Sequence, residues 1–210
     1  MTTFYCVRHG KTEFNQHQIF QGGLADSPLL PEGQQTAALA GSFLQHISFD
    51  RAFVSPQKRA QDTAKLLLQA HGSVTPLETI NDLREMEFGE WDGQPESDYY
   101  DYPEFQNLVH APHLYNPTAF GGESFDTLIK RTLSVFDTLA KTYPEDTILI
   151  VSHGLTLQTV LKTLNGSSVA EIRSGRLLDN TSITTLVSTL NDSNEPCYSI
   201  TDWNNTNHIK

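Results

Sequence analysis

Two histidines occupy nearly the same sequence setting although they lie far apart in the chain. His9 follows the run from Phe4 to Arg8, His153 follows the run from Ile148 to Ser152, and each histidine precedes a glycine. Both runs are rich in residues that favour β-strands, so each imidazole is expected at the carboxyl end of a strand, where open α/β sheets bind ligands. Together with Arg8, the two rings would form a compact site for a dianion such as phosphate.

Phosphoryl transfer requires a nucleophile in line with phosphorus, cations at the non-bridging oxygens and an acid for the leaving oxygen. A neutral imidazole at His9 could be the nucleophile and form a phosphohistidine intermediate. The planar guanidinium groups of Arg8 and Arg59 suit phosphate oxygens, and Arg59 comes just inside a helix that follows a strand. His153 would complete the cationic cluster. Glu85 is the candidate proton donor.

Strand-like and helix-like segments alternate along the chain, which indicates an α/β fold with a mainly parallel sheet. Apolar runs bounded by turn residues predict strands at 4–7, 52–54, 147–151, 182–188 and 198–202. Apolar residues at helical spacing predict helices at 31–46, 56–70, 124–142 and 155–164. Residues 1–210 are expected to form a single domain.

Residues 90–122 differ from the rest of the chain because they are rich in Pro, Tyr and acidic residues and show weak periodicity. Long irregular segments of compact domains are often lids or binding loops, so we expect a lid here rather than a surface excursion without a role. The stretch between Arg84 and Lys130 contains no Lys or Arg. Such an acidic and aromatic wall favours a phosphate ester with an uncharged or apolar leaving group.

The overall composition argues against several classes of partner. A net charge of −11 disfavours nucleic acids and anionic membrane surfaces. No apolar run approaches the ~20 residues that span a bilayer, and the N-terminus enters a strand pattern without a secretory signal. Cys6 and Cys197 are too few for a disulfide scaffold, so we expect a cytoplasmic protein with both cysteines buried in strands. We also expect a monomer or a homodimer.

Several blocks of the sequence, in order, resemble the histidine phosphatase superfamily, which has the phosphoglycerate mutase-like fold. The blocks are Arg8-His-Gly-Lys-Thr12 with Asn15; Gln21-Gly22 with residues 26–29 and 32–33; Ser55 and Arg59-Ala60; Leu83-Arg84-Glu85 with residues 88–93; Gly122-Glu-Ser124; and Val151-Ser-His-Gly154. The resemblance implies a three-layer α/β/α sandwich with a mainly parallel central sheet and a lid-like insertion around 90–122. It implies neither a metal nor a cofactor.

The resemblance also implies roles for individual residues. His9 would accept the phosphoryl group, Arg8, Arg59 and His153 would hold it, and Glu85 would protonate the leaving group and later activate water. Further substrate contacts would come from the rim of the pocket, at Asn15, Gln21, Gly22 and Gly154. Two departures from the family pattern concern substrate detail: Asp62 stands where Gln is common, and the helix after Gly154 lacks an Arg that is frequent there.

The family contains phosphomonoesterases and mutases, and the sequence of the lid helps to distinguish the two activities. A cofactor-dependent phosphoglycerate mutase must hold a carboxylate and a second phosphate, so the absence of basic residues from the lid favours hydrolysis of a small-molecule phosphate monoester. A phosphoserine or protein-histidine phosphatase is compatible with the same core site. A non-catalytic phosphate-binding module is the least favoured alternative, because His9, Glu85 and His153 are all retained.

Four further side chains have competing interpretations. His110 and His113 have no third ligand nearby, so we do not expect a metal site there. Arg84 is expected to form structural ion pairs. Glu123, at the start of a predicted helix, could cap that helix or reach the pocket, and the sequence leaves both open.

Overall fold

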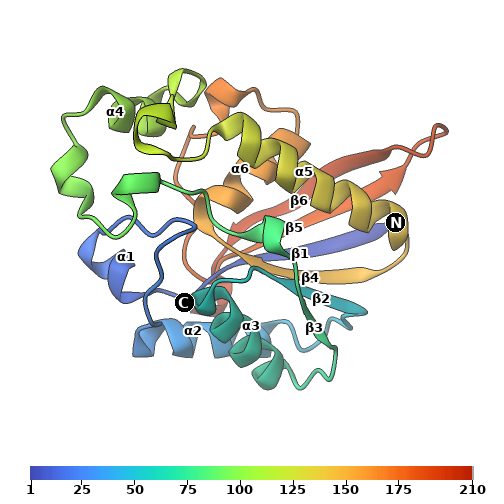
Figure 1. Cartoon of the computed structure of the whole chain (residues 1–210). Coiled ribbons are helices and arrows are strands. Elements are labelled where there is room, and N and C mark those ends of the chain that lie inside the picture. The colour runs from blue at the N-terminus through green and yellow to red at the C-terminus, as the bar shows by residue number, and fades with distance from the viewer. Residues whose placement is uncertain (210) are drawn as a thin grey trace.

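A six-stranded sheet forms the centre of the computed structural model, which describes residues 1–209, and its strand order is β3-β2-β4-β1-β5-β6 (Figure 1). The strands are β1 (Thr2–Arg8), β2 (Arg51–Val54), β3 (Leu77–Thr79), β4 (Thr147–Ser152), β5 (Ile183–Leu190) and β6 (Pro196–Asn205). The first four in the strand order run parallel, and β5 and β6 complete the sheet as antiparallel strands. The predicted mainly parallel sheet is confirmed.

Helices cover both faces of the sheet and produce the expected three layers (Figure 1). One face packs on α5 (Phe125–Thr142) and α6 (Gly154–Leu164), and the other packs on α2 (Pro31–Phe43) and α3 (Lys58–His71). Alternate residues of a strand point to opposite faces. Accordingly Phe4 and Cys6 of β1 join the α5–α6 core, whereas Val7 joins the α2–α3 core.

The predicted helices are present, and their ends follow local chemistry. Ser124 caps α5 through a hydrogen bond from the Thr127 backbone N–H, and Gly72 ends α3 with a φ of 77°, which favours glycine. The short helix α1 (Glu13–His17) and strand β3 were not predicted. The prediction that both cysteines are buried is wrong for Cys197, because it lies on the exposed face of β6.

The segment 90–122 folds over one end of the sheet with more regular structure than its sequence suggests. It contains α4 (Pro103–His110) and the single-turn 3₁₀ helices η2 (Gly89–Trp91), η3 (Glu96–Tyr99), η4 (Pro112–Leu114) and η5 (Pro117–Phe120). The rings of Trp91 and Phe120 stack with centroids 4.1 Å apart. Their cluster continues onto Phe125 of α5 and Leu155 of α6, so the lid shares a core with the sandwich.

The remaining elements are the short 3₁₀ helices η1 (Asn81–Leu83), η6 (Val169–Glu171) and η7 (Asn207–Ile209). Among the described residues, no helix is both long and apolar enough to cross a bilayer.

Candidate active site

The two histidines meet because their strands are neighbours. β1 and β4 pair in parallel with Arg8 opposite Ser152, so His9 and His153 leave the sheet at the same edge. Their ring centroids are 5.2 Å apart. Ser55 leaves β2 at this edge too, and its N–H donates to the Val151 carbonyl of β4. His9, His153 and Ser55 therefore lie together, because each follows one of three adjacent parallel strands.

The His9 imidazole is buried and held in one tautomer. Its Nδ1 lies 2.8 Å from the Gly10 carbonyl oxygen, which can only accept, so Nδ1 carries the proton and Nε2 keeps its lone pair. Burial, with the nearby charges of Arg59 and Arg8, lowers the pKa of His9 well below its usual range. The neutral imidazole that a nucleophile requires is therefore the favoured form.

Gly10 is itself held by the helical layer. Its N–H donates to Oγ1 of Thr63 in α3 at 2.9 Å. A Cβ atom at Gly10 would lie 2.6 Å from the carbonyl oxygen of Gly33 in α2, so only glycine allows this close approach. The carbonyl that orients His9 is thus fixed by contacts with both α2 and α3.

His153 takes the opposite tautomer because of its two partners. Nε of Arg59 donates to Nδ1 at 3.2 Å, so the ring proton is on Nε2, which donates to Oγ of Ser55 at 2.6 Å. Burial and the positive charge of Arg59 lower the pKa of His153 well below its usual range. The His153 ring is consequently neutral and fixed in orientation behind His9.

Arg59 is completely buried and acts as an anchor for the loop that precedes α2. Besides its bond to His153, its guanidinium donates to the carbonyls of Gln21, Gly22 and Ala25 and pairs with Asp26 at 3.0 Å. Burial lowers the pKa of Arg59, and Asp26 counteracts this effect. The side chain does not line the cavity described below, so any contact with a phosphoryl group requires a rearrangement of these bonds.

In contrast to Arg59, Arg8 has few hydrogen-bond partners, so several of its donors are available to a ligand. One terminal nitrogen donates to the Leu178 carbonyl, while the buried Nε has no partner among the described residues. The guanidinium lies across Gly154, where an added Cβ would be 2.9 Å from Nε. Burial lowers the pKa of Arg8 to about 10, so it remains a cation at neutral pH.

The Glu85 carboxylate is fixed by the N-terminus of α6. Oε1 accepts hydrogen bonds from the Met86 N–H and from both the N–H and the hydroxyl of Thr156, whereas Oε2 accepts one from the Leu155 N–H at 3.1 Å. Gln57 accepts from the Glu85 N–H at 2.8 Å. Because Oε1 has three donor groups within hydrogen-bond distance and Oε2 has only one, Oε2 is the oxygen with more capacity to exchange a proton with a ligand. Thr156 and Gln57 escaped the sequence analysis because neither falls at a recognisable motif position.

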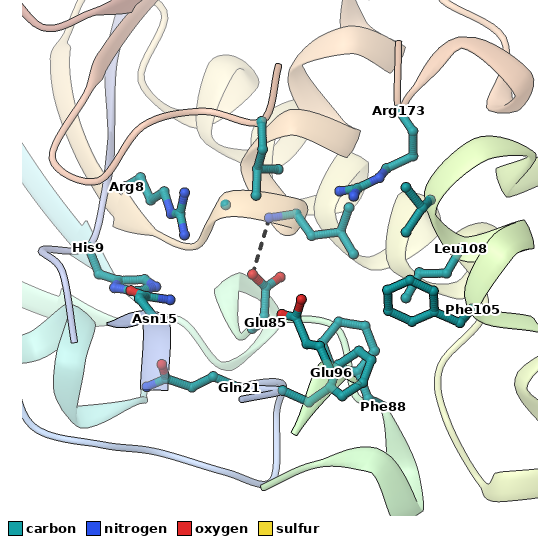
Figure 2. Close-up of a pocket in the computed structure, with 15 residues that line it drawn as sticks. Arg8, His9, Asn15, Gln21, Glu85, Phe88, Glu96, Phe105, Leu108 and Arg173 are labelled. Carbon is teal, nitrogen blue, oxygen red and sulfur yellow. Dashed lines mark hydrogen bonds between the residues drawn. The ribbon is translucent and has the colours of Figure 1, made fainter. Parts of the chain in front are cut away.

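Arg8, His9 and Glu85 border a cavity of about 140 Å³ between the sheet edge and the lid (Figure 2), whereas His153, which was expected to hold the phosphoryl group, does not line it. It is lined by Arg8, His9, Asn15, Phe20, Gln21, Glu85, Phe88, Glu96, Phe105, Leu108, Val109, Gly154, Leu155, Arg173 and Leu177. Of the predicted rim residues, Asn15, Gln21 and Gly154 line it. Gly22 does not, because its N–H donates to Asp92 and its carbonyl accepts from Gln57. Phe105, Leu108 and Val109 come from α4, so the predicted lid does cover the cavity.

Arg173 corrects the expectation of a wall without cations. It follows η6 and enters the cavity on the side away from His9 (Figure 2), where Glu96 of η3 also reaches the lining. Burial lowers the pKa of Arg173, and the charges of Glu85 and Glu96 oppose this shift. This cation comes from the segment between α6 and β5 and not from the lid, whose sequence has no Lys or Arg.

The side chains with competing interpretations lie outside the cavity. Glu123 forms a buried ion pair with Arg131 of α5 at 2.7 Å, and Arg131 also donates to the Glu85 carbonyl at 3.3 Å. Neither Glu123 nor Ser124 reaches the cavity; Ser124 is the cap. Arg84 pairs with Asp82 and Glu87, as predicted. Within residues 1–209 no three His, Cys, Asp or Glu side chains are arranged to hold a metal ion.

Fold and site together define an α/β protein with a buried pair of histidines at the carboxyl edge of the parallel strands. Residues 4–205 match the family model of the histidine phosphatase superfamily (branch 1). The chain therefore belongs to that superfamily, as its motifs indicated.

Individual relatives include both a phosphatase and a mutase. The chain is 30% identical over 181 residues to the uncharacterized phosphatase PhoE of Bacillus subtilis, covering 85% of each chain. It is 29% identical over 174 residues to a 2,3-bisphosphoglycerate-dependent phosphoglycerate mutase of Cytophaga hutchinsonii, covering 82% of this chain and 81% of the mutase. Among solved structures, YhfR of Bacillus stearothermophilus superposes with a TM-score of 0.90 at 28% identity and complete coverage of both chains.

Proposed function

We propose that this protein is a metal-independent phosphomonoesterase that hydrolyses small-molecule phosphate esters through a phosphohistidine on His9. The observation that carries the proposal is the state of His9: a buried, neutral imidazole with Nδ1 committed to the Gly10 carbonyl and Nε2 free beside the cation Arg8. A phosphate-binding module needs cations but has no need of a nucleophile prepared in this way.

In the first step, Nε2 of His9 attacks phosphorus and the bond from phosphorus to the ester oxygen breaks. A proton held on Oε2 of Glu85 moves to that oxygen, so the leaving group departs as a neutral alcohol. Arg8 stabilises the charge on the non-bridging oxygens, with Asn15 at the rim. In the second step water attacks the phosphohistidine, its proton passes to the Glu85 carboxylate, and the electrons of the nitrogen–phosphorus bond return to Nε2.

The size and wall of the cavity support a small substrate. About 140 Å³ is well below the ~300–1,000 Å³ of typical pockets for drug-sized ligands. Phe20, Phe88 and Phe105 add an apolar surface against the leaving group. These features favour a compact monoester over a nucleotide or a folded phosphoprotein.

The test is release of inorganic phosphate from p-nitrophenyl phosphate in excess EDTA. The wild type should turn over, His9→Ala should lose activity by several orders of magnitude, and His17→Ala should not, because His17 is exposed on α1 outside the cavity. Acid quenching during turnover of a radiolabelled ester should trap label on the wild-type chain and none on His9→Ala. Full activity of His9→Ala, or activity that EDTA abolishes, would refute the mechanism.

Phosphoglycerate mutase activity is the second candidate, because Arg173 supplies the cation that the lid lacks and a mutase is among the relatives. The same preparation should therefore be assayed with 3-phosphoglycerate in the presence of 2,3-bisphosphoglycerate. Interconversion of phosphoglycerates with negligible phosphate release would replace the hydrolase proposal with this one. Absence of both activities would leave a phosphate-binding module.

A further inference from the structure

Residues 178–181 lead into β5 and contact the end of β1 through a strained piece of backbone. Thr181 is buried and has a φ of 57°, a left-handed conformation that a β-branched residue rarely adopts. Its N–H donates to the Arg8 carbonyl at 3.0 Å, and the Leu178 carbonyl accepts from the Arg8 guanidinium. Strain of this kind persists only where the surroundings enforce it, and it is common at functional sites. The turn brings the side chain of Asn180 against the candidate site.

The side-chain amide of Asn180 joins two residues that line the cavity. Its Nδ2 lies 3.0 Å from the His9 carbonyl oxygen and 3.2 Å from Oδ1 of Asn15. A backbone carbonyl oxygen can only accept, so the NH₂ group of Asn180 faces this side and has one hydrogen for each partner. Asn180 itself does not line the cavity. Any effect of Asn180 on a ligand is therefore transmitted through the residues that it holds.

The amide of Asn15 has a fixed orientation because both of its partners are donors. Oδ1 accepts from Asn180 and also from the Thr12 N–H at 3.2 Å, and a backbone N–H can only donate. The NH₂ group of Asn15 has no hydrogen bond within the described residues, and Asn15 lines the cavity next to His9 (Figure 2). The N–H donors are thus the part of this amide that is available to a ligand.

We propose that Asn180 is a positioning residue for phosphoryl transfer, which holds the Asn15 amide so that its N–H donors, and not its oxygen, meet a phosphoryl oxygen. The inference rests on the proposed phosphatase function and extends it to a residue outside the cavity. The reverse orientation would place Oδ1 against an anion and repel it. Without Asn180, Oδ1 would keep only the Thr12 bond, whereas the His9 carbonyl would still accept from the Thr181 N–H at 3.3 Å. Asn15 is therefore the residue through which Asn180 acts.

A double-mutant cycle separates this role from a purely structural one. Asn180→Ala should lower kcat/KM for p-nitrophenyl phosphate roughly three- to tenfold, as expected when one charge-assisted hydrogen bond is weakened by about half. In an Asn15→Ala background, which is itself impaired, the same substitution should change kcat/KM by less than about twofold. Equal fold-losses in the two backgrounds would overturn the proposal, because Asn180 would then act independently of Asn15.

The inhibition constant of inorganic phosphate provides a readout that does not depend on the folded fraction. It should rise roughly three- to tenfold in Asn180→Ala and at least as much in Asn15→Ala, which has no amide donor. Asn180→Asp keeps the shape of the side chain but offers only acceptors, so it would attract Nδ2 of Asn15 away from the ligand. This variant should weaken phosphate inhibition more than Asn180→Ala, and it covers the case in which Asn180→Ala does not fold. An inhibition constant equal to that of the wild type in either variant would contradict the proposal.

Asn205 of β6 provides a matched control. Its half-buried amide donates to Oδ2 of Asp202 at 2.6 Å and lies outside the cavity. Asn205→Ala should leave kcat/KM and phosphate inhibition unchanged. The phosphatase function is tested separately, since an active His9→Ala would refute that function. An active wild type whose Asn180→Ala variant matches it in both measurements would refute only the role of Asn180.

Discussion

Replacement of Gly154 by alanine tests whether the position of Arg8 sets the rate. The added Cβ would lie 2.9 Å from Nε and 3.0 Å from Cζ of Arg8, whereas ordinary contacts begin at 3.4 Å. The guanidinium must therefore move by about half an ångström, away from the position in which it lines the cavity. Its one hydrogen bond, to the Leu178 carbonyl, restrains it only at one terminal nitrogen.

The expected effect is a loss of activity with little loss of stability. A charge-assisted hydrogen bond contributes about 1.5–3 kcal/mol, so weakening of the proposed Arg8–phosphate contact by about half should lower kcat/KM for p-nitrophenyl phosphate roughly three- to tenfold. The free energy of unfolding should change by less than about 1 kcal/mol, because the displaced atoms lie near the end of a flexible side chain and alanine has less conformational freedom than glycine to lose on folding. Steady-state kinetics and urea denaturation measure the two quantities.

Gly41→Ala provides the contrast. A Cβ at Gly41 of α2 would lie 2.1 Å from the Leu67 carbonyl oxygen. This oxygen belongs to the backbone of α3, so it can move only if the two helices move apart. This variant should be destabilised while its folded fraction keeps its kcat/KM. Normal folding and full activity of Gly154→Ala would show that the position of Arg8 does not set the rate, since the steric conflict would then have no consequence for phosphate binding.

Three further predictions concern groups around the cavity. Below pH 6.5 the unfolded chain protonates His9 before the folded chain does, so acidification destabilises the fold, and His9→Asn should reduce the slope of unfolding free energy against pH by up to about 1.4 kcal/mol per unit in urea titrations. Glu123→Leu leaves Arg131 buried without its carboxylate and should cost about 3 kcal/mol, measured by thermal unfolding. Thr156→Val removes a hydrogen bond to Glu85 and should lower kcat about tenfold in steady-state assays.

The last two of these predictions have matched controls at an exposed or remote position. Glu195→Gln breaks only the exposed pair with Lys141 and should cost less than about 1 kcal/mol, and Thr163→Val removes only a bond within α6. An unaltered pH slope in His9→Asn would show that His9 is not held neutral by the fold. Equal stability of the Glu123 and Glu195 variants, or full kcat in Thr156→Val, would contradict the roles assigned to Arg131 and Thr156.

The predicted elements agree best with the structure where apolar residues recur at regular spacing and a capping residue marks the end of the element. The helix from 124 to 142 is the clearest case, because Ser124 caps it and apolar residues recur along the buried face. Prediction failed for β3, which has three residues and only one partner strand, β2, and for α4, whose buried side depends mainly on aromatic contacts within the lid. Such elements derive their stability from tertiary contacts rather than from their own periodicity.

The residues of the candidate site also include some that the sequence predicts and some that it does not. His9 and His153 were predictable because each follows a strand, and neighbouring parallel strands end at one edge. Arg173 was not, because it lies in an irregular segment whose approach to the lid depends on how α6 and η6 turn. The tautomer of His9 was equally beyond the sequence, since it depends on which carbonyl oxygen falls within 2.8 Å of Nδ1.

The contacts that fix Gly10 have a consequence for how this chain can diversify. The hydrogen bond from Gly10 to Thr63 and its close approach to Gly33 make the reactive nitrogen of His9 dependent on α2 and α3, which face away from the cavity. Neutral drift in those helices is therefore restricted at positions that never touch a substrate. The lid and the segment around Arg173 do not carry this constraint, so the far wall of the cavity can change in sequence while the orientation of His9 is kept.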